Sequence, residues 1–156
     1  MKIKLILPGK TDEKYLIEST SQYIKRIQHY IQLEIIEIPF KHLKNQKPEL
    51  YKIAESQAIE NQLSTSDFLV LLDEHGKSFG SVEFANWIQG RMNSGLKQLT
   101  FAIGGPYGFS EEIKARAQLL ISLSQMTFSH QMIRLFFLEQ LYRAFTILRN
   151  EPYHNS

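Results

Sequence analysis

The chain has 156 residues, of which 43% are hydrophobic and 22% are charged, and this balance fits one compact globular domain. It contains no cysteine, which excludes disulfides, zinc–thiolate sites and thiol nucleophiles. The formal net charge of +2 is too small to indicate nucleic-acid binding by itself, and no apolar run approaches the roughly 18 residues that span a bilayer. We therefore expect a single domain over residues 1–156, cytoplasmic and without a membrane anchor.

Apolar runs of strand length alternate with helical patterns in the first part of the chain. Ile3–Leu7 and Leu33–Ile38 predict two strands. Between them, apolar residues at helical spacing predict a helix over Glu13–His29. A second helix is expected over Lys47–Leu63, because Pro48 suits a first helical turn.

The same alternation continues in the middle of the chain. Asp67–Asp73 is a nearly continuous apolar run, which is typical of a strand buried on both faces. A polar loop is expected over Glu74–Gly80, followed by a helix that Ser81 caps and Gly95 ends. Leu99–Ile103 predicts another buried strand.

The last third adds a turn, a strand and two helices. Gly104–Phe109 is a glycine-rich turn, and Ser110 precedes two glutamates, as at many helix starts. Ile121–Thr127 predicts a fifth strand, and Ser129 is expected to cap a long helix over His130–Leu148. The alternation predicts an α/β fold with a mostly parallel sheet and helices on both faces.

Three segments follow strand ends, which is where parallel sheets bind ligands. Gly104, Gly105 and Gly108 allow a ligand to approach the backbone, although their spacing is neither a dinucleotide fingerprint nor a P-loop. Asp73 can accept hydrogen bonds from ribose or amine groups, and residues 122–130 lead into a helix start with free backbone N–H groups. Taken singly, such a turn, a loop acid or a lone histidine is more often structural.

The last helix and the tail suggest contacts with other molecules. Apolar residues cover most of the circumference of His130–Leu148, and one sheet face cannot cover them all. A second subunit in a two-fold dimer is therefore expected, with a central core helix of a monomer as the alternative. In the tail 149–156, Tyr153 can stack on an exposed base and Arg149 or His154 can contact phosphate, whereas a functionless terminus is the default.

Together these segments resemble the ribosomal RNA large-subunit methyltransferase H family of the SPOUT class. The residues that carry the resemblance are Ile103–Gly108, Leu123–His130, Arg134, Glu139–Ala144 and Pro152–His154. The match runs nearly end to end, and the order and spacing of these pieces are specific. The resemblance implies a C-terminal trefoil knot, a homodimer and S-adenosylmethionine as methyl donor. It also implies methylation at N3 of a pseudouridine in large-subunit rRNA.

The resemblance further implies which residues form the site. The donor would contact Leu72, Gly104, Gly105, Gln125, Met126, Thr127, Phe128, Ser129 and His130. The RNA substrate would be bound by Arg143, Tyr153 and His154, opposite the donor site of the partner subunit. Arg143 and His154 are the catalytic candidates. Arg143 could stabilise the anion that forms on the base, and His154 or His130 could accept the N3 proton.

No metal site is expected. A sulfonium donor is already activated, so that positioning can supply most of the rate enhancement without a metal ion. The histidines are also scattered along the chain, at His29, His42, His75, His130 and His154.

One position departs from the family, and two other interpretations remain open. Ser129 stands where the family usually has proline before the histidine matching His130, which makes the turn less rigid, although serine can cap the helix. One alternative is a non-enzymatic RNA- or ribosome-binding module. The other is a flavodoxin-like nucleotide-binding domain, against which the missing phosphate motif counts.

Overall fold

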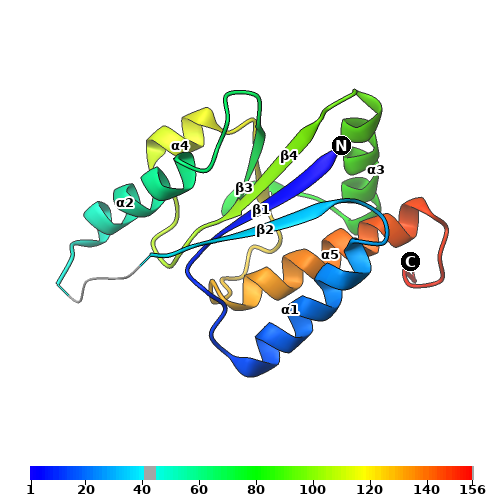
Figure 1. The fold of residues 1–156 in the computed structure, drawn as a ribbon, viewed down its shortest axis with the longest axis horizontal. Coiled ribbons are helices and arrows are strands. Elements are labelled where there is room, and N and C mark those ends of the chain that lie inside the picture. Colours follow the sequence, from blue (N-terminus) through cyan, green and yellow to red (C-terminus); the bar gives the residue numbers. More distant parts are fainter. Residues whose placement is uncertain (41–44, 156) are drawn as a thin grey trace.

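A computed structural model describes residues 1–40 and 45–155. Its strands are β1 (Lys2–Pro8), β2 (Leu33–Ile38), β3 (Phe68–Ser78), β4 (Gln98–Ile103) and β5 (Leu119–Ser122). Its helices are α1 (Lys14–Ile27), α2 (Pro48–Glu60), α3 (Ser81–Asn93), α4 (Glu111–Arg116) and α5 (Met132–Leu148). The described strands form one parallel sheet in the order β2-β1-β4-β3-β5 (Figure 1).

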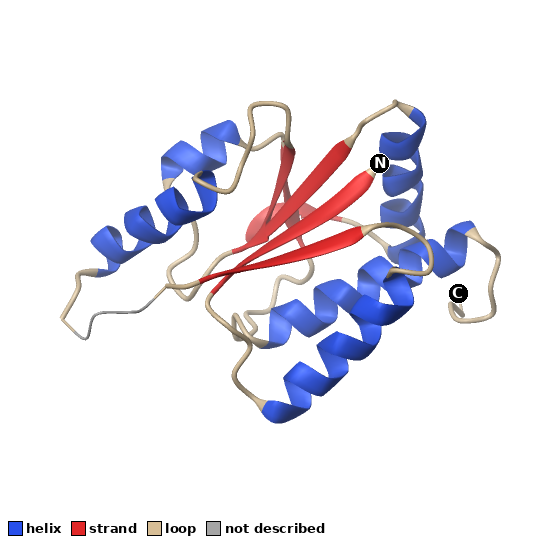
Figure 2. Ribbon diagram, in the orientation of Figure 1, coloured by secondary structure: helices blue, strands red, loops and turns tan. Residues whose placement is uncertain are grey.

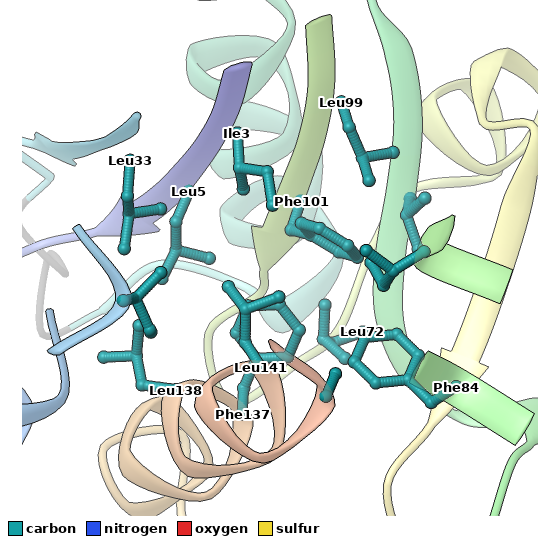
Figure 3. Close-up of a cluster of buried hydrophobic side chains, with 14 of the residues drawn as sticks. Ile3, Leu5, Leu33, Leu72, Phe84, Leu99, Phe101, Phe137, Leu138 and Leu141 are labelled. Carbon is teal, nitrogen blue, oxygen red and sulfur yellow. The ribbon is translucent and has the colours of Figure 1, made fainter. Parts of the chain in front are cut away.

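Helices cover both faces of this sheet, as the alternation along the chain predicted. The helices α1, α3 and α5 lie on one face, and α2 and α4 lie on the other (Figure 2). Successive side chains of each strand point to opposite faces, so the sheet separates two apolar cores. On the α5 side, the rings of Phe101 and Phe137 lie 4.8 Å apart between their centroids (Figure 3). The α/β prediction is confirmed, and the trefoil knot stays a prediction.

Several residues begin or end helices as the sequence predicted. Pro48 begins α2, and the Ser110 Oγ accepts the Ile113 N–H at the start of α4. Gly95 has a φ of +76° just beyond α3, a conformation that glycine adopts without strain. Ser81, however, does not cap α3, since Gly80 is the N-cap residue and the Ser81 hydroxyl donates to Gln140 on α5.

Two strand boundaries differ from the sequence prediction. The expected loop over Glu74–Gly80 is wrong, because β3 continues to Ser78 after a shift of register and pairs with β5. A Cβ on Gly76 would lie 2.5 Å from the Leu120 backbone, so glycine permits this close approach. The fifth strand covers Leu119–Ser122 rather than Ile121–Thr127. Beyond Ser122, the chain leaves the sheet because hydroxyl groups of serines bond to the backbone.

The long helix α5 is packed between α1 and α3 (Figure 1). None of its residues is exposed, although many are only half-buried. The neighbouring helices α1 and α3 thus bury part of the apolar surface of α5. The homodimer stays a prediction. Figure 3 shows Phe137, Leu138 and Leu141 of α5 directed toward the sheet.

Candidate functional site

A cavity of about 340 Å³ lies at the carboxyl ends of β4 and β5, beside the shift of register that follows Leu72 in β3. This is the edge at which parallel sheets place their ligands, and the volume lies in the range of small-molecule sites. Three segments far apart in the sequence enclose it: residues 72–75, 103–109 and 123–133. Leu72, which precedes the register shift of β3, and Ile103, which ends β4, are buried and give the cavity an apolar floor.

Acidic residues at the register shift within β3 line one side of the cavity. The Asp73 side chain is only 8% exposed, accepts the His75 backbone N–H at 2.8 Å and lies 3.7 Å from the Lys114 Nζ. Glu74 accepts the Thr127 hydroxyl at 3.0 Å. These contacts join β3 to the segments on either side, and they place carboxylate oxygens where a ribose or an amine could donate to them.

The glycine-rich loop forms a second side. Gly104, Gly105 and Gly108 all line the cavity, and Gly108 has a φ of +74°. The Gly105 carbonyl accepts the Gly108 N–H at 3.2 Å, which closes a tight turn. Backbone groups therefore make up much of this side, as the sequence predicted from its glycines.

The segment between β5 and α5 forms a third side. Met126, Thr127, Phe128 and His130 line the cavity, and Met126 is 74% exposed. Burial is the main cause that lowers the pKa of His130, the Arg134 charge adds to it, and Asp12 opposes it. His130 is therefore neutral at neutral pH and able to accept a proton.

A buried arginine fixes the start of α5 against the first strand. Arg134 is 1% exposed and donates to the backbone oxygens of Pro8 and Gly9 at 2.7 and 3.1 Å, and to the Thr11 hydroxyl. Gln131 makes further contacts with the same loop. These bonds hold the segment before α5 at a defined distance from β1. The sequence interpretation gave Arg134 no role of its own.

Ser129 is not the N-cap residue that the sequence predicted, because α5 begins at Met132 and Gln131 holds that position, but Ser129 still accepts hydrogen bonds from the first turn of the helix. Its Oγ accepts the Met132 N–H at 3.1 Å, and its carbonyl accepts the Ile133 N–H. Ser129→Ala is expected to lower the free energy of unfolding by about 1 kcal/mol, because a helix N–H loses its partner. Urea denaturation measures the change. Ser21→Ala, on the exposed side of α1, is the control, and an equal loss there would contradict the assignment.

Seven of the nine residues predicted to contact the donor line this cavity. Gln125 and Ser129 do not. The sequence interpretation missed several cavity residues, namely Lys52, Pro106, Tyr107, Lys114, Leu123, Ser124 and Ile133. Leu123 and Ser124 belonged to the quoted motif but had been assigned to a strand. Lys52 lies on α2, about fifty residues from the glycine loop, and no local pattern marks it.

The three predicted substrate residues lie together, at the other end of α5. Arg143 donates to Glu139 at 2.5 Å, lies 4.7 Å from the centre of the Tyr153 ring, and has its Nη1 3.3 Å from the His154 Nδ1. The hydrogen bond to Glu139 raises the pKa of Arg143. Burial, followed by the bonds to Tyr23 and Glu139, raises the pKa of Tyr153. The cluster thus presents a fixed cation and a protonated phenol.

This C-terminal cluster, which we define as Glu139, Arg143, Tyr153 and His154, is remote from the cavity of the same chain. Ile133 lines the cavity, and Arg143 lies ten residues further along α5, which corresponds to about 15 Å at 1.5 Å per residue. The sequence resemblance placed the two groups in different subunits. A single chain accordingly does not bring Arg143 to its own cavity.

The described residues show neither a metal site nor a membrane span. Among residues 1–40 and 45–155, no group of three or more His, Asp or Glu side chains is arranged to hold a metal ion. No helix in the same ranges is long and apolar enough to cross a membrane. His42 and Ser156, which the sequence interpretation included, lie outside the described residues.

Sequence comparisons match nearly the whole chain to one family of proteins. The family model described as "Predicted SPOUT methyltransferase" matches residues 1–154. A protein of Christiangramia forsetii is 58% identical over 156 residues, and the match covers 99% of each chain. Proteins of Flavobacterium johnsoniae and Phocaeicola vulgatus are 56% and 53% identical, with the same coverage. All three are named "Ribosomal RNA large subunit methyltransferase H".

Proposed function

The chain belongs to the SPOUT methyltransferase family, and we propose from this premise that it methylates large-subunit ribosomal RNA with S-adenosylmethionine as the methyl donor. The observation that carries the proposal is the cavity, because seven residues predicted from a family motif converge on it from three distant segments. The proposed target atom is N3 of a pseudouridine, as the family resemblance implies. A ribosomal substrate also places the protein in the cytoplasm.

The cavity suits a nucleoside with a charged amino-acid tail. Its floor of Leu72 and Ile103 offers apolar surface for an adenine, and Asp73 and Glu74 offer acceptors for hydroxyl or ammonium groups. Backbone groups of the glycine loop can bond to the edge of a base. Its volume of about 340 Å³ is compatible with a ligand of this size that remains partly open to solvent.

The chemistry of the donor leaves few tasks to the protein. When bound, S-adenosylmethionine would supply a methyl group activated by its positively charged sulfur, and the residues that line the cavity would hold it. The residues of the chain then have to hold the donor, orient the base and remove the N3 proton. We assign the first task to the cavity. His130, which is neutral and lines the cavity, and His154 are the candidates for the last task.

The remaining task, stabilising the base as it loses its proton, is assigned to Arg143. Its guanidinium keeps its charge and is held in place by Glu139 and the Tyr153 ring. A fixed cation of this kind lowers the energy of a developing anion. Because about 15 Å of α5 separates it from its own cavity, we propose that it serves the cavity of a second copy in a homodimer.

A composite site predicts that two inactive variants complement each other. Arg143→Ala removes the cation, and Leu123→Trp places a larger side chain in the cavity. A heterodimer of the two, isolated with two different affinity tags, contains one site with both halves intact. It is expected to show about half of the wild-type activity, whereas each homodimer is expected to retain about 1% or less. An inactive heterodimer that still binds the donor would show that each site is formed within one chain.

The direct test of function uses ribosomal substrates. Purified protein is incubated with labelled S-adenosylmethionine and with assembled ribosomes, isolated large subunits or free rRNA, and the RNA is then digested and mapped by mass spectrometry. We expect transfer of label to one nucleotide of large-subunit rRNA. Binding to ribosomes without any transfer would instead support the non-enzymatic RNA-binding module.

A further inference from the structure

The glycine-rich loop is held from behind by two consecutive side chains of α2. The Gly105 N–H donates to the Glu55 Oε1 at 2.7 Å, and the Ser110 N–H donates to the Ser56 Oγ at 2.9 Å. Both side chains are buried, with Glu55 only 1% exposed. These two bonds secure both ends of the segment 105–110, whose residues from Gly105 to Phe109 all line the cavity.

Gly105 is packed directly against this carboxyl group. A Cβ added to Gly105 would lie 2.3 Å from the Glu55 Oε2 and 3.0 Å from its carboxyl carbon. A side chain at this position therefore displaces either the loop or the end of the Glu55 side chain. Contact with Glu55 thus favours glycine at position 105, independently of any ligand in the cavity.

Burying the Glu55 carboxyl group costs free energy, because the group loses its contacts with water. Besides the Gly105 N–H, the Tyr51 side chain forms a hydrogen bond with this carboxyl group. Burial raises the pKa of Glu55, against the opposing effects of the Gly105 N–H, the Tyr51 hydroxyl and the Arg134 charge. An apolar side chain of similar shape would avoid this desolvation. The carboxyl group is thus explained best by the backbone N–H that it accepts.

We propose that Glu55 and Ser56 are positioning residues of the donor site, which fix the loop 105–110 in the conformation that receives the ligand. Neither residue lines the cavity, so each acts through the backbone that it holds. The identity of the ligand rests on the proposed function, whereas the fixing of the loop does not. Preforming a binding loop strengthens affinity, because less ordering is needed when the ligand binds.

Two substitutions of Glu55 distinguish its role as a hydrogen-bond acceptor from a role that only fills space behind the loop. Glu55→Gln keeps the size and a carbonyl oxygen, whereas Glu55→Met keeps the length but has no oxygen. We expect Glu55→Met and Ser56→Ala to weaken binding of S-adenosylmethionine about tenfold or more, and Glu55→Gln to stay within about threefold of wild type. Isothermal titration calorimetry, performed well below the melting temperature of every variant, measures the dissociation constants.

Amide exchange of the ligand-free protein provides a second readout. By NMR, the Gly105 amide is expected to exchange about tenfold faster or more in Glu55→Met, and the Ser110 amide likewise in Ser56→Ala. Asp67→Asn is the control, because Asp67 is a buried carboxylate at the opposite end of β3 that bonds to Ser64 and Lys4. It should lower the melting temperature and leave both the loop amides and the donor affinity unchanged.

The outcomes distinguish this inference from the proposed function. Wild-type affinity and unchanged Gly105 exchange in Glu55→Met would overturn the positioning role, since the residue would then only fill space. If the wild-type protein itself failed to bind S-adenosylmethionine, the proposed function would fail. The exchange rates of Gly105 and Ser110 would still decide whether Glu55 and Ser56 hold the loop.

Discussion

Arg143→Ala is expected to slow methylation about 10²- to 10³-fold, as for the loss of one group that stabilises a developing anion. The dissociation constant of the donor should stay within twofold of wild type, because Arg143 is assigned to the base of the RNA and is not among the residues that line the cavity. Single-turnover assays with saturating donor and RNA measure the chemical step. Calorimetry measures donor binding separately.

Two further variants test the reason for this loss. Arg143→Lys keeps the charge but cannot hold the contacts to Glu139, His154 and the Tyr153 ring together, so we expect a partial loss. Arg26→Ala is the matched control, because Arg26 packs on the rings of Tyr23 and Tyr142 without an ion pair to Glu139. Loss of donor affinity in Arg143→Ala would show that the assignment of this residue to the substrate is wrong.

Gly105→Val is expected to abolish measurable donor binding and to lower the free energy of unfolding by about 1–3 kcal/mol. From sequence alone, the expected cause was a side chain filling the space of the ligand. The structure places the added Cβ against the Glu55 carboxyl group, so displacement of the loop is the cause that the geometry supports. Calorimetry and urea denaturation measure the two effects.

A double variant distinguishes the two causes. If the clash with Glu55 is responsible, Gly105→Ala combined with Glu55→Ala should bind the donor no more weakly than Glu55→Ala alone. If the side chain fills the space of the ligand, the double variant should bind more weakly. Gly90→Ala is the control, since no atom lies within 4 Å of its added Cβ, and it should stabilise α3 slightly.

The sequence predicted the elements of this fold well where the signal was local. The apolar runs of β1 and β4, the proline at the start of α2 and the serine cap of α4 all depend on neighbouring residues, and all are confirmed. The end of β3 and the start of β5 were wrong, because their pairing depends on Gly76 lying against the Leu120 backbone. A local pattern carries no information on such a distant contact.

In the candidate site too, features with a local sequence signal were predicted, whereas a feature that depends on a distant contact was not. Glycines at a strand end and a family motif indicated one cavity, and seven of the nine named residues lie there. Glu55 was not found, although its contact favours glycine at position 105. It lies fifty residues earlier on a helix, where a glutamate normally indicates a solvated surface. Only the packing of α2 against the loop reveals its burial.

The bonds from Arg134 to Pro8 and Gly9 also constrain how the chain is made. They join residues about 125 positions apart, and β1 pairs with β4 as well as with β2. While the chain is being synthesised, β1 therefore gains its second strand neighbour β4 only after residue 103, and the helix α5 only when nearly all residues have left the tunnel. We infer that native structure is acquired late, in one step, and that truncation before α5 yields a chain prone to aggregation.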